Sequence, residues 1–184
     1  MMQKKTYTVC VFCGSKSGSN IKYLKLANKL GKKLAERNCN VIYGGGNSGL
    51  MGALAEGVLE KNGSLVSVIP KFFKNKMDVI KSKKEIITED LFERKKIMIK
   101  NSDIFIALPG GFGTLDEVFE LIALNQLSLI NKKIIILDIN NFWYSLKNLI
   151  KDLKKNGFLY TNKNKNIIFK NSISKVIEFI ENSF

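Results

Sequence analysis

Two short charged clusters in this 184-residue chain carry side chains that could do chemistry. The first is the run 93–95, Glu-Arg-Lys, and the second is Asp116-Glu117 with Glu120 close behind. The chain has no histidine, so acid–base chemistry must come from carboxylates, lysine, tyrosine or cysteine. Of the 30 basic residues only two are arginines, and Arg94 is one of them. Its planar guanidinium could contact a phosphate or a base. Alternatively, Arg94 is a solvated residue on a helix surface.

Three glycine-rich turns each follow a short apolar run and precede a helix-like segment. They lie at 13–19, 44–49 and 109–114. In open α/β sheets, ligands bind beyond the carboxyl ends of the strands, where helix N-termini offer unpaired N–H groups to a phosphate. Glycine also lets the backbone approach an anion closely. Three such turns in one domain predict a ligand that bears a phosphate group.

These turns match neither of the common nucleotide-binding patterns. The first turn lacks the spacing of G-x-G-x-x-G, and no acidic residue closes the second predicted strand to hold a cofactor ribose. The sequence also lacks a G-x-x-x-x-G-K-[ST] loop, which argues against a nucleoside-triphosphate hydrolase. The pattern is therefore that of a Rossmann-like sheet without the dinucleotide signature.

The run 114–117 has two interpretations. Its first and last residues have the spacing of a capping box, in which Glu117 reaches back to a backbone N–H. Yet Asp116, Glu117 and Glu120 crowd negative charge at the helix start where a phosphate is expected. The conflict disappears if the phosphate lies on the Gly111 side while a carboxylate faces the sugar. Glu117 could then hold a hydroxyl or water and stabilise the sugar cation that forms in glycosidic cleavage.

The elements that must position these residues follow from the alternation of short apolar runs with amphipathic segments, which is typical of a parallel sheet with crossover helices. The sequence predicts strands at Thr6–Phe12, Val41–Tyr43, Leu65–Ile69, Glu85–Thr88, Ile104–Leu108, Lys133–Asp138 and Ile167–Phe169. It predicts helices at Ile21–Arg37, Leu50–Glu60, Leu91–Lys100, Thr114–Leu127, Phe142–Lys155 and Ile173–Glu181. An irregular connection is expected at Phe72–Lys84 and a loop at Tyr160–Asn166. We expect an α/β fold with a Rossmann-like, doubly wound, mostly parallel sheet, helices on both faces, and one domain over residues 1–184.

Composition and charge indicate which kinds of binding partner to expect. The net charge of +14 is spread along the chain without a recognition-helix or base-stacking motif, so we expect it to attract a phosphorylated small molecule rather than nucleic acid. No apolar stretch approaches the roughly 20 residues of a membrane span, and no signal-peptide pattern opens the chain, so we expect a cytoplasmic location. Cys10 and Cys13 both fall in the first predicted strand, on opposite faces. Buried structural thiols are therefore favoured over a redox pair.

Four runs together resemble one known family. They are 10–15, 43–52, 93–95 and 109–117, and they closely resemble the LOG (LONELY GUY) family of cytokinin riboside 5′-monophosphate phosphoribohydrolases, often mislabelled as lysine decarboxylases. The likeness covers nearly the full length and keeps the order of the motifs. The run P-G-G-x-G-T-x-x-E with an upstream R-K is highly specific to this family and its close relatives.

The resemblance implies a Rossmann-like fold, a homodimer or larger assembly of dimers, and a hydrolysis that needs neither metal nor cofactor. The substrate would be a nucleoside 5′-monophosphate, and the products a free base, such as adenine or a prenylated adenine, and ribose 5-phosphate. Arg94 and Glu117 would be the catalytic pair. The substrate-binding residues would be Gly14, Ser15, Gly44, Gly45, Gly46, Lys95, Gly111, Phe112, Gly113, Thr114, Leu115 and Asp116.

Two departures from the family pattern concern the base. Phe92 stands where members usually carry histidine, and Ala123-Leu124 replaces a common Thr-Trp pair. Both leave the expected catalytic pair intact and bear on which base is preferred. The alternative function is a non-catalytic nucleotide or cofactor carrier on the same scaffold. A decarboxylase would need a pyridoxal phosphate lysine and its partners, a constellation for which the sequence gives no indication.

Overall fold

The computed structural model describes residues 6–74, 80, 82–160 and 164–183. Within them, seven parallel strands form one sheet in the order β4-β3-β2-β1-β5-β6-β7. The strands are β1 (Thr8–Phe12), β2 (Asn40–Tyr43), β3 (Ser64–Pro70), β4 (Lys84–Thr88), β5 (Ile104–Ala107), β6 (Lys133–Leu137) and β7 (Ile167–Lys170). The chain moves outward from β1 to β4 and then crosses back to β5. The strand order therefore reverses between β1 and β5, which is where ligands bind in open α/β sheets.

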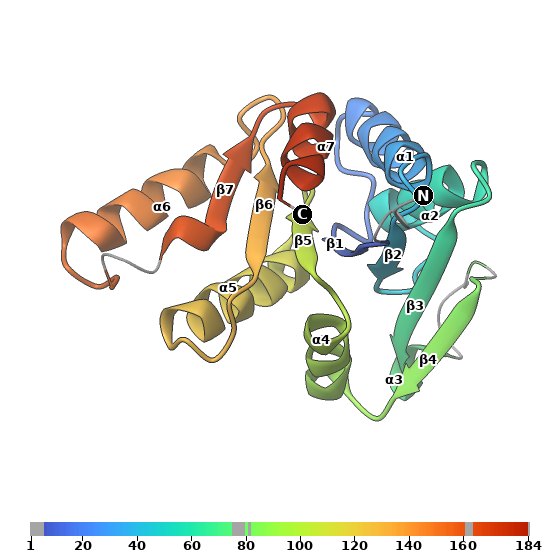
Figure 1. The fold of residues 1–184 in the computed structure, drawn as a ribbon, viewed down its shortest axis with the longest axis horizontal. Coiled ribbons are helices and arrows are strands. Elements are labelled where there is room, and N and C mark those ends of the chain that lie inside the picture. The colour runs from blue at the N-terminus through green and yellow to red at the C-terminus, as the bar shows by residue number, and fades with distance from the viewer. Residues whose placement is uncertain (1–5, 75–79, 81, 161–163, 184) are drawn as a thin grey trace, which may run out of the picture.

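Helices cover both faces of the sheet (Figure 1). They are α1 (Lys22–Ala35), α2 (Gly49–Leu59), α3 (Lys71–Lys74), α4 (Leu91–Lys100), α5 (Phe112–Gln126), α6 (Tyr144–Lys155) and α7 (Ile173–Glu181), with a 3-10 turn η1 (Asn164–Asn166). One core cluster joins the sheet to α1, α2 and α7, and the other joins it to α4, α5 and α6. The predicted Rossmann-like α/β fold is thus confirmed. No helix among the described residues is both long and apolar enough to cross a bilayer.

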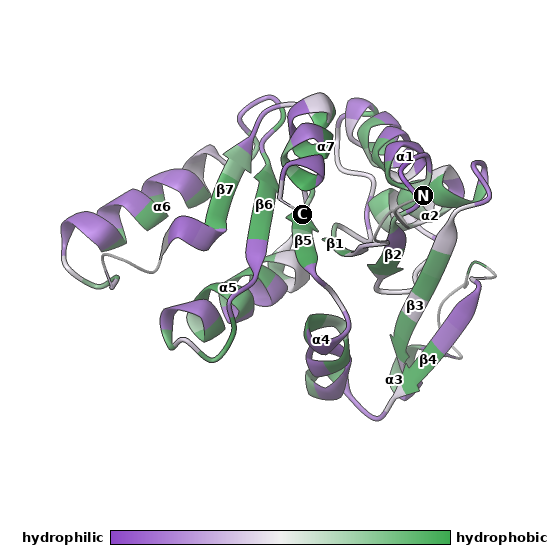
Figure 2. Ribbon diagram, viewed as in Figure 1, coloured by the Kyte–Doolittle hydropathy of each residue, from purple (hydrophilic) through white to green (hydrophobic). Residues whose placement is uncertain are grey.

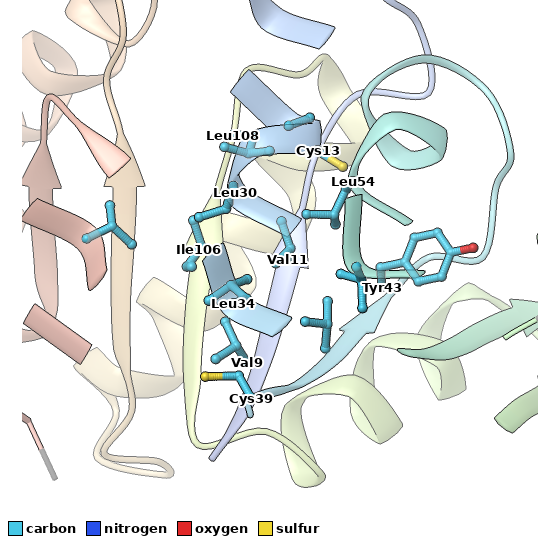
Figure 3. Close-up of a cluster of buried hydrophobic side chains, with 14 of the residues drawn as sticks. Val9, Val11, Cys13, Leu30, Leu34, Cys39, Tyr43, Leu54, Ile106 and Leu108 are labelled. Atoms are coloured by element: carbon cyan, nitrogen blue, oxygen red, sulfur yellow. The ribbon is translucent and has the colours of Figure 1, made fainter. Parts of the chain in front are cut away.

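The central strands are apolar on both sides because both faces are covered. Figure 2 shows the contrast between the apolar strands and the polar outer surface of α6. Along β1, Val9 and Val11 point into the cluster with α1 and α2 (Figure 3), whereas Cys10 and Phe12 belong to the opposite cluster. Cys13 follows β1 rather than lying inside it, so its predicted place in the strand is wrong by one residue. Its thiol nevertheless lies on the opposite face from Cys10, and both are free and buried.

Helices α1 and α2 pack backbone to backbone. A Cβ at Gly31 would overlap the carbonyl oxygen of Leu54, and one at Gly57 would overlap that of Asn28. These two glycines let the helices approach more closely than side chains would allow. The contact fixes α2, and with it the glycine turn that precedes this helix.

Every predicted helix and strand end lies within two residues of the observed one, and three segments either bear on the site or contain an additional element. Helix α5 begins at Phe112 with Gly111 as N-cap, two residues before the predicted start, because the glycine turn itself winds into the helix. The predicted irregular connection at 72–84 opens with the short helix α3, and its residues 75–79 and 81 lie outside the described residues. The predicted loop at 160–166 ends in η1, and its residues 161–163 are also outside them.

Candidate active site

The three glycine turns meet at the carboxyl ends of β2, β1 and β5. The first turn lies between the other two, because β1 lies between β2 and β5. The N–H of Gly14 donates to the carbonyl oxygen of Pro109 at 3.1 Å, and the N–H of Leu50 donates to the carbonyl oxygen of Gly14 at 3.0 Å. Ser48 Oγ also donates to the carbonyl oxygen of Ser15 at 3.1 Å. The prediction that the turns share one rim is therefore confirmed.

The glycines of these turns have different structural roles. A Cβ at Gly44 would lie 2.5 Å from Nη2 of Arg94, and one at Gly110 would overlap the side chain of Thr114. Gly45 adopts a φ of +86° against Ile69, a conformation that favours glycine. These three positions serve close packing of the protein on itself.

Gly111 and Gly113 are different, because a Cβ at either would meet no atom within 4 Å. Both are exposed, and they flank Phe112, the first residue of α5, whose side chain is 91% exposed. The first N–H groups of a helix lack partners within the helix and favour an anion. The N-terminus of α5 is therefore the part of the rim that is open to an anionic ligand.

Arg94 and Glu117 face each other across the space between α4 and α5. Arg94 Nη2 donates to Glu117 Oε1 at 2.7 Å, and their side chains are 16% and 9% exposed. Helix α4 is started by Asp90, whose carboxylate accepts from the Glu93 N–H at 2.8 Å. That cap sets the register in which Arg94 turns inward over Gly44. The predicted catalytic pair is thus brought together from positions 23 residues apart.

This pairing also decides between the two interpretations of Glu117. Thr114 lies inside the first turn of α5 rather than at its N-cap, and the Glu117 carboxylate is bonded to Arg94. A capping box at Thr114 is therefore not the role of Glu117. The carboxylates that do serve capping in this region belong to Asp90 and Glu93 at the start of α4.

The electrostatics of Glu117 are unusual for a carboxylate. Burial raises its pKa, the Arg94 guanidinium lowers it, and nearby Asp116 raises it, with a net pKa of about 7. The Nε of Arg94 is buried and has no hydrogen-bond partner among the residues that the structure describes. A buried donor without a partner is costly, so it is a natural contact for an acceptor on a ligand. The pair can supply a carboxylate that titrates near neutrality and a fixed cation beside it.

The Lys95 ammonium group pairs with two other carboxylates, those of Asp116 and Glu120. Its Nζ lies 2.9 Å from Asp116 Oδ2 and 2.6 Å from Glu120 Oε2, and its side chain is 11% exposed. The contact with Asp116 is a hydrogen bond, whereas the contact with Glu120 is an ion pair without hydrogen-bond geometry. Sequence reasoning placed Lys95 with the nucleotide and did not foresee these partners, although the acidic spacing on α5 contained the signal.

The remaining predicted site residues lie at or near the rim. Ser15 is exposed in the first turn, Gly14 is half-buried between the other turns, and Gly46 is buried in the second turn. Thr114 is 3% exposed, and Leu115 is half-buried within the first turn of α5. The structure therefore gathers the predicted residues around the β1–β5 switch point.

Comparison with known proteins gives a consistent match. A family model described as possible lysine decarboxylase matches residues 51–180. The chain is 35% identical over 182 residues to cytokinin riboside 5′-monophosphate phosphoribohydrolase LOG4 of Arabidopsis thaliana, covering 98% of this chain and 85% of that protein. It is 40% identical over 152 residues to LOG5 of the same plant, covering 82% and 67%.

Solved structures share the fold at lower identity. The molybdenum cofactor binding protein of Rippkaea orientalis superposes with a TM-score of 0.73 at 22% identity, covering 98% of this chain and 99% of that one. The molybdenum cofactor carrier protein of Chlamydomonas reinhardtii gives 0.75 at 18% identity, covering 97% and 98%. At these identities the likeness concerns the fold alone.

Proposed function

The chain belongs to the LOG family of cytokinin riboside 5′-monophosphate phosphoribohydrolases, and on that premise we propose that it hydrolyses the N-glycosidic bond of an adenine-type nucleoside 5′-monophosphate. Water adds at C1′ of the sugar, the base leaves with a proton, and the products are the free base and ribose 5-phosphate. The observation that carries the proposal is the buried Glu117 carboxylate, held 2.7 Å from Arg94 beside the open N-terminus of α5.

The phosphate binds at the N-terminus of α5. Its charge is matched there by the unpaired N–H groups and the positive end of the helix dipole, and Gly111 and Gly113 leave room for it. The rest of the nucleotide site would be lined by Gly14, Ser15, Gly44, Gly45, Gly46, Phe112, Thr114, Leu115 and Asp116, of which Gly44 and Gly45 shape the rim by close packing rather than by contact with the phosphate. This arrangement puts the sugar beyond the phosphate, toward Glu117.

Glu117 and Arg94 act on the sugar and its leaving base. The transition state of glycosidic cleavage resembles an oxocarbenium ion, which a carboxylate stabilises electrostatically. With a pKa of about 7, Glu117 can also accept a proton from the attacking water at neutral pH. The Arg94 guanidinium orients the nucleotide by charge and hydrogen bonding. Its unpartnered Nε is the donor available for that contact.

We propose further that the substrates are cytokinin riboside 5′-monophosphate, AMP, or both, and that the enzyme works in the cytoplasm as a homodimer or an assembly of dimers. The whole chain, residues 1–184, would form one hydrolase domain. No metal or cofactor takes part in this mechanism. The alternative carrier function would leave the Arg94–Glu117 pair without a task, so the hydrolase is favoured.

The test is release of free base. Purified protein is incubated with AMP and, separately, with isopentenyladenosine 5′-monophosphate, and the base is detected by chromatography. We expect Glu117→Gln and Arg94→Ala each to lower kcat by at least about 10³-fold, the scale on which removal of one preorganised charge acts. Both variants should keep the wild-type circular dichroism spectrum.

The exposed Lys151→Met variant on α6 is the control and should retain wild-type rates. Wild-type-like turnover in either site variant would defeat the catalytic assignment. If the folded wild-type protein binds both nucleotides but releases base from neither, the carrier function would be favoured instead.

A further inference from the structure

Lys95 lies near the site and is held by two carboxylates and an aromatic ring of the protein. Its ammonium group bonds both oxygens of Asp116, at 3.1 and 2.9 Å, and lies 2.6 Å from Glu120 Oε2. The ring centroid of Phe92, on the same helix, is 5.5 Å from Lys95 Nζ. The side chain is therefore held between α4 and α5 and is 11% exposed.

The two acids that Lys95 binds flank the proposed catalytic carboxylate in sequence. Asp116 precedes Glu117 directly, and Glu120 follows it by one helical turn. Three negative side chains this close together on α5 would repel each other and repel the substrate phosphate. Arg94 pairs with Glu117 and Lys95 pairs with the other two. Two adjacent cations on α4 thus face three carboxylates on α5, which leaves one negative charge in excess.

We propose that Lys95 is a positioning residue: by pairing with Asp116 and Glu120 it joins α4 to α5 and offsets part of the negative charge beside Glu117, without itself binding the substrate. Because it is the next residue to Arg94 on a rigid helix, fixing Lys95 also fixes the approach of Arg94 to Glu117. The catalytic consequence of this role rests on the proposed hydrolase function, whereas its structural consequence does not.

The charged and titratable groups that face Glu117 support this role. Arg94 and Lys95 on α4 lower the pKa of Glu117, whereas Asp116 and Glu120 on α5 raise it. On the β1 side, burial raises the pKa of the Cys10 and Cys13 thiols, so both stay neutral. Removing Lys95 should therefore raise the pKa of Glu117. Removing Asp116 should lower it.

Kinetics as a function of pH separate positioning from phosphate binding. In Lys95→Met we expect the acidic limb of the kcat profile to move to higher pH by roughly half a unit or more, with KM changing less than about twofold. Asp116→Asn should move the limb to lower pH. The double variant Lys95→Met/Asp116→Asn should return it toward the wild-type position, because it removes one charge of each sign and leaves the net charge around Glu117 unchanged. Lys96→Met, on the exposed neighbour in α4, is the matched control.

A readout without substrate keeps this test independent of the proposed reaction. The carboxyl carbon of Glu117 is followed by NMR during a pH titration and identified by its loss in Glu117→Gln. We expect a higher midpoint in Lys95→Met, a lower one in Asp116→Asn, and a near wild-type one in the double variant Lys95→Met/Asp116→Asn. Midpoints that do not move would overturn the proposal whatever the enzyme acts on. So would a KM raised tenfold or more in Lys95→Met with an unmoved acidic limb, since that pattern belongs to a phosphate ligand.

Discussion

At the scale of single residues, the proposed chemistry depends on where one carboxylate lies. Glu117 is 7% exposed, and burial raises its pKa to about 7 even though Arg94 is bonded to it. An ordinary surface glutamate would be fully charged at neutral pH and would be a weak base. The desolvated position makes the same side chain able to exchange a proton near pH 7, which is the condition for efficient general base catalysis.

Burial of Glu117 should also leave a signature in stability. Its folded pKa, about 7, lies above the ordinary value of 4.5, so the native state holds the proton more tightly than the unfolded chain. The associated stability is fully present below about pH 4.5 and is lost as the pH rises through about 7. Relative to Glu117→Gln, we expect the free energy of unfolding of the wild type to fall by an amount on the order of 3 kcal/mol between pH 4 and pH 8.

Urea denaturation of both proteins across this range measures the difference. The comparison with glutamine removes the contribution of the other titrating groups, which are the same in both chains. A difference that stays constant with pH would mean that Glu117 titrates alike in the folded and unfolded states, and would contradict its described burial.

At the scale of elements, the glycine turns illustrate what sequence can and cannot specify. Their place on one rim followed from their position after predicted strands, because parallel strands end at the same edge. Their individual tasks did not follow. Whether a glycine leaves room for a ligand, as at Gly111, or for an arginine, as at Gly44, depends on which helix crosses above it. That is a tertiary fact that the local sequence does not contain.

A pair of glycine-to-alanine variants tests this division. In Gly44→Ala the new Cβ would lie 2.5 Å from Nη2 of Arg94, and the flexible arginine tip would move aside. We expect kcat to fall at least about tenfold, since small displacements of a catalytic group are costly, with little change in Tm. In Gly63→Ala the new Cβ would meet the Ala35 Cβ at 2.5 Å and the Val58 carbonyl oxygen at 3.0 Å. These neighbours cannot move freely, so Tm should fall while kcat of the folded enzyme is retained.

Thermal denaturation and initial rates on both variants are the measurements. We expect Gly44→Ala to lose activity but not stability, and Gly63→Ala to lose stability but not activity. Equal losses of Tm in both, with unchanged kcat in Gly44→Ala, would show that Gly44 is a packing residue and not a support for Arg94.

At the scale of the whole molecule, the sequence predicted the architecture well because hydrophobic periodicity is a local signal that many residues carry together. Helix starts were less accurate, as at Phe112, because a glycine turn can wind into a helix without an N-cap side chain to mark it. The proposed catalytic pair was predicted from residue type and family resemblance, and the structure shows its ion pair. Pairings such as Lys95 with Glu120 were missed, since positions 25 residues apart meet only after folding.

The assembly is also a property of the whole molecule. Several large apolar side chains are at least 49% exposed in the single chain, on α4, on α5 and just after α5, and exposed apolar groups of this kind mark interaction surfaces. They are Leu91, Phe92, Phe112, Leu127 and Leu129. We expect light scattering to give a mass of twice 20.8 kDa or a larger even multiple. A fully active monomer across the working concentration range would contradict this expectation.

The contrast between the two faces of the sheet has a consequence for the order in which the enzyme loses its activity and its fold on heating. Helices α1 and α2 meet backbone to backbone through Gly31 and Gly57, whereas Arg94 and Glu117 meet at the tips of side chains carried by α4 and α5. A slip of one ångström between α4 and α5 would break their 2.7 Å bond and leave most of the core undisturbed. Inactivation should therefore come before unfolding on heating, so that the protein keeps its shape for some degrees after it has stopped being a catalyst.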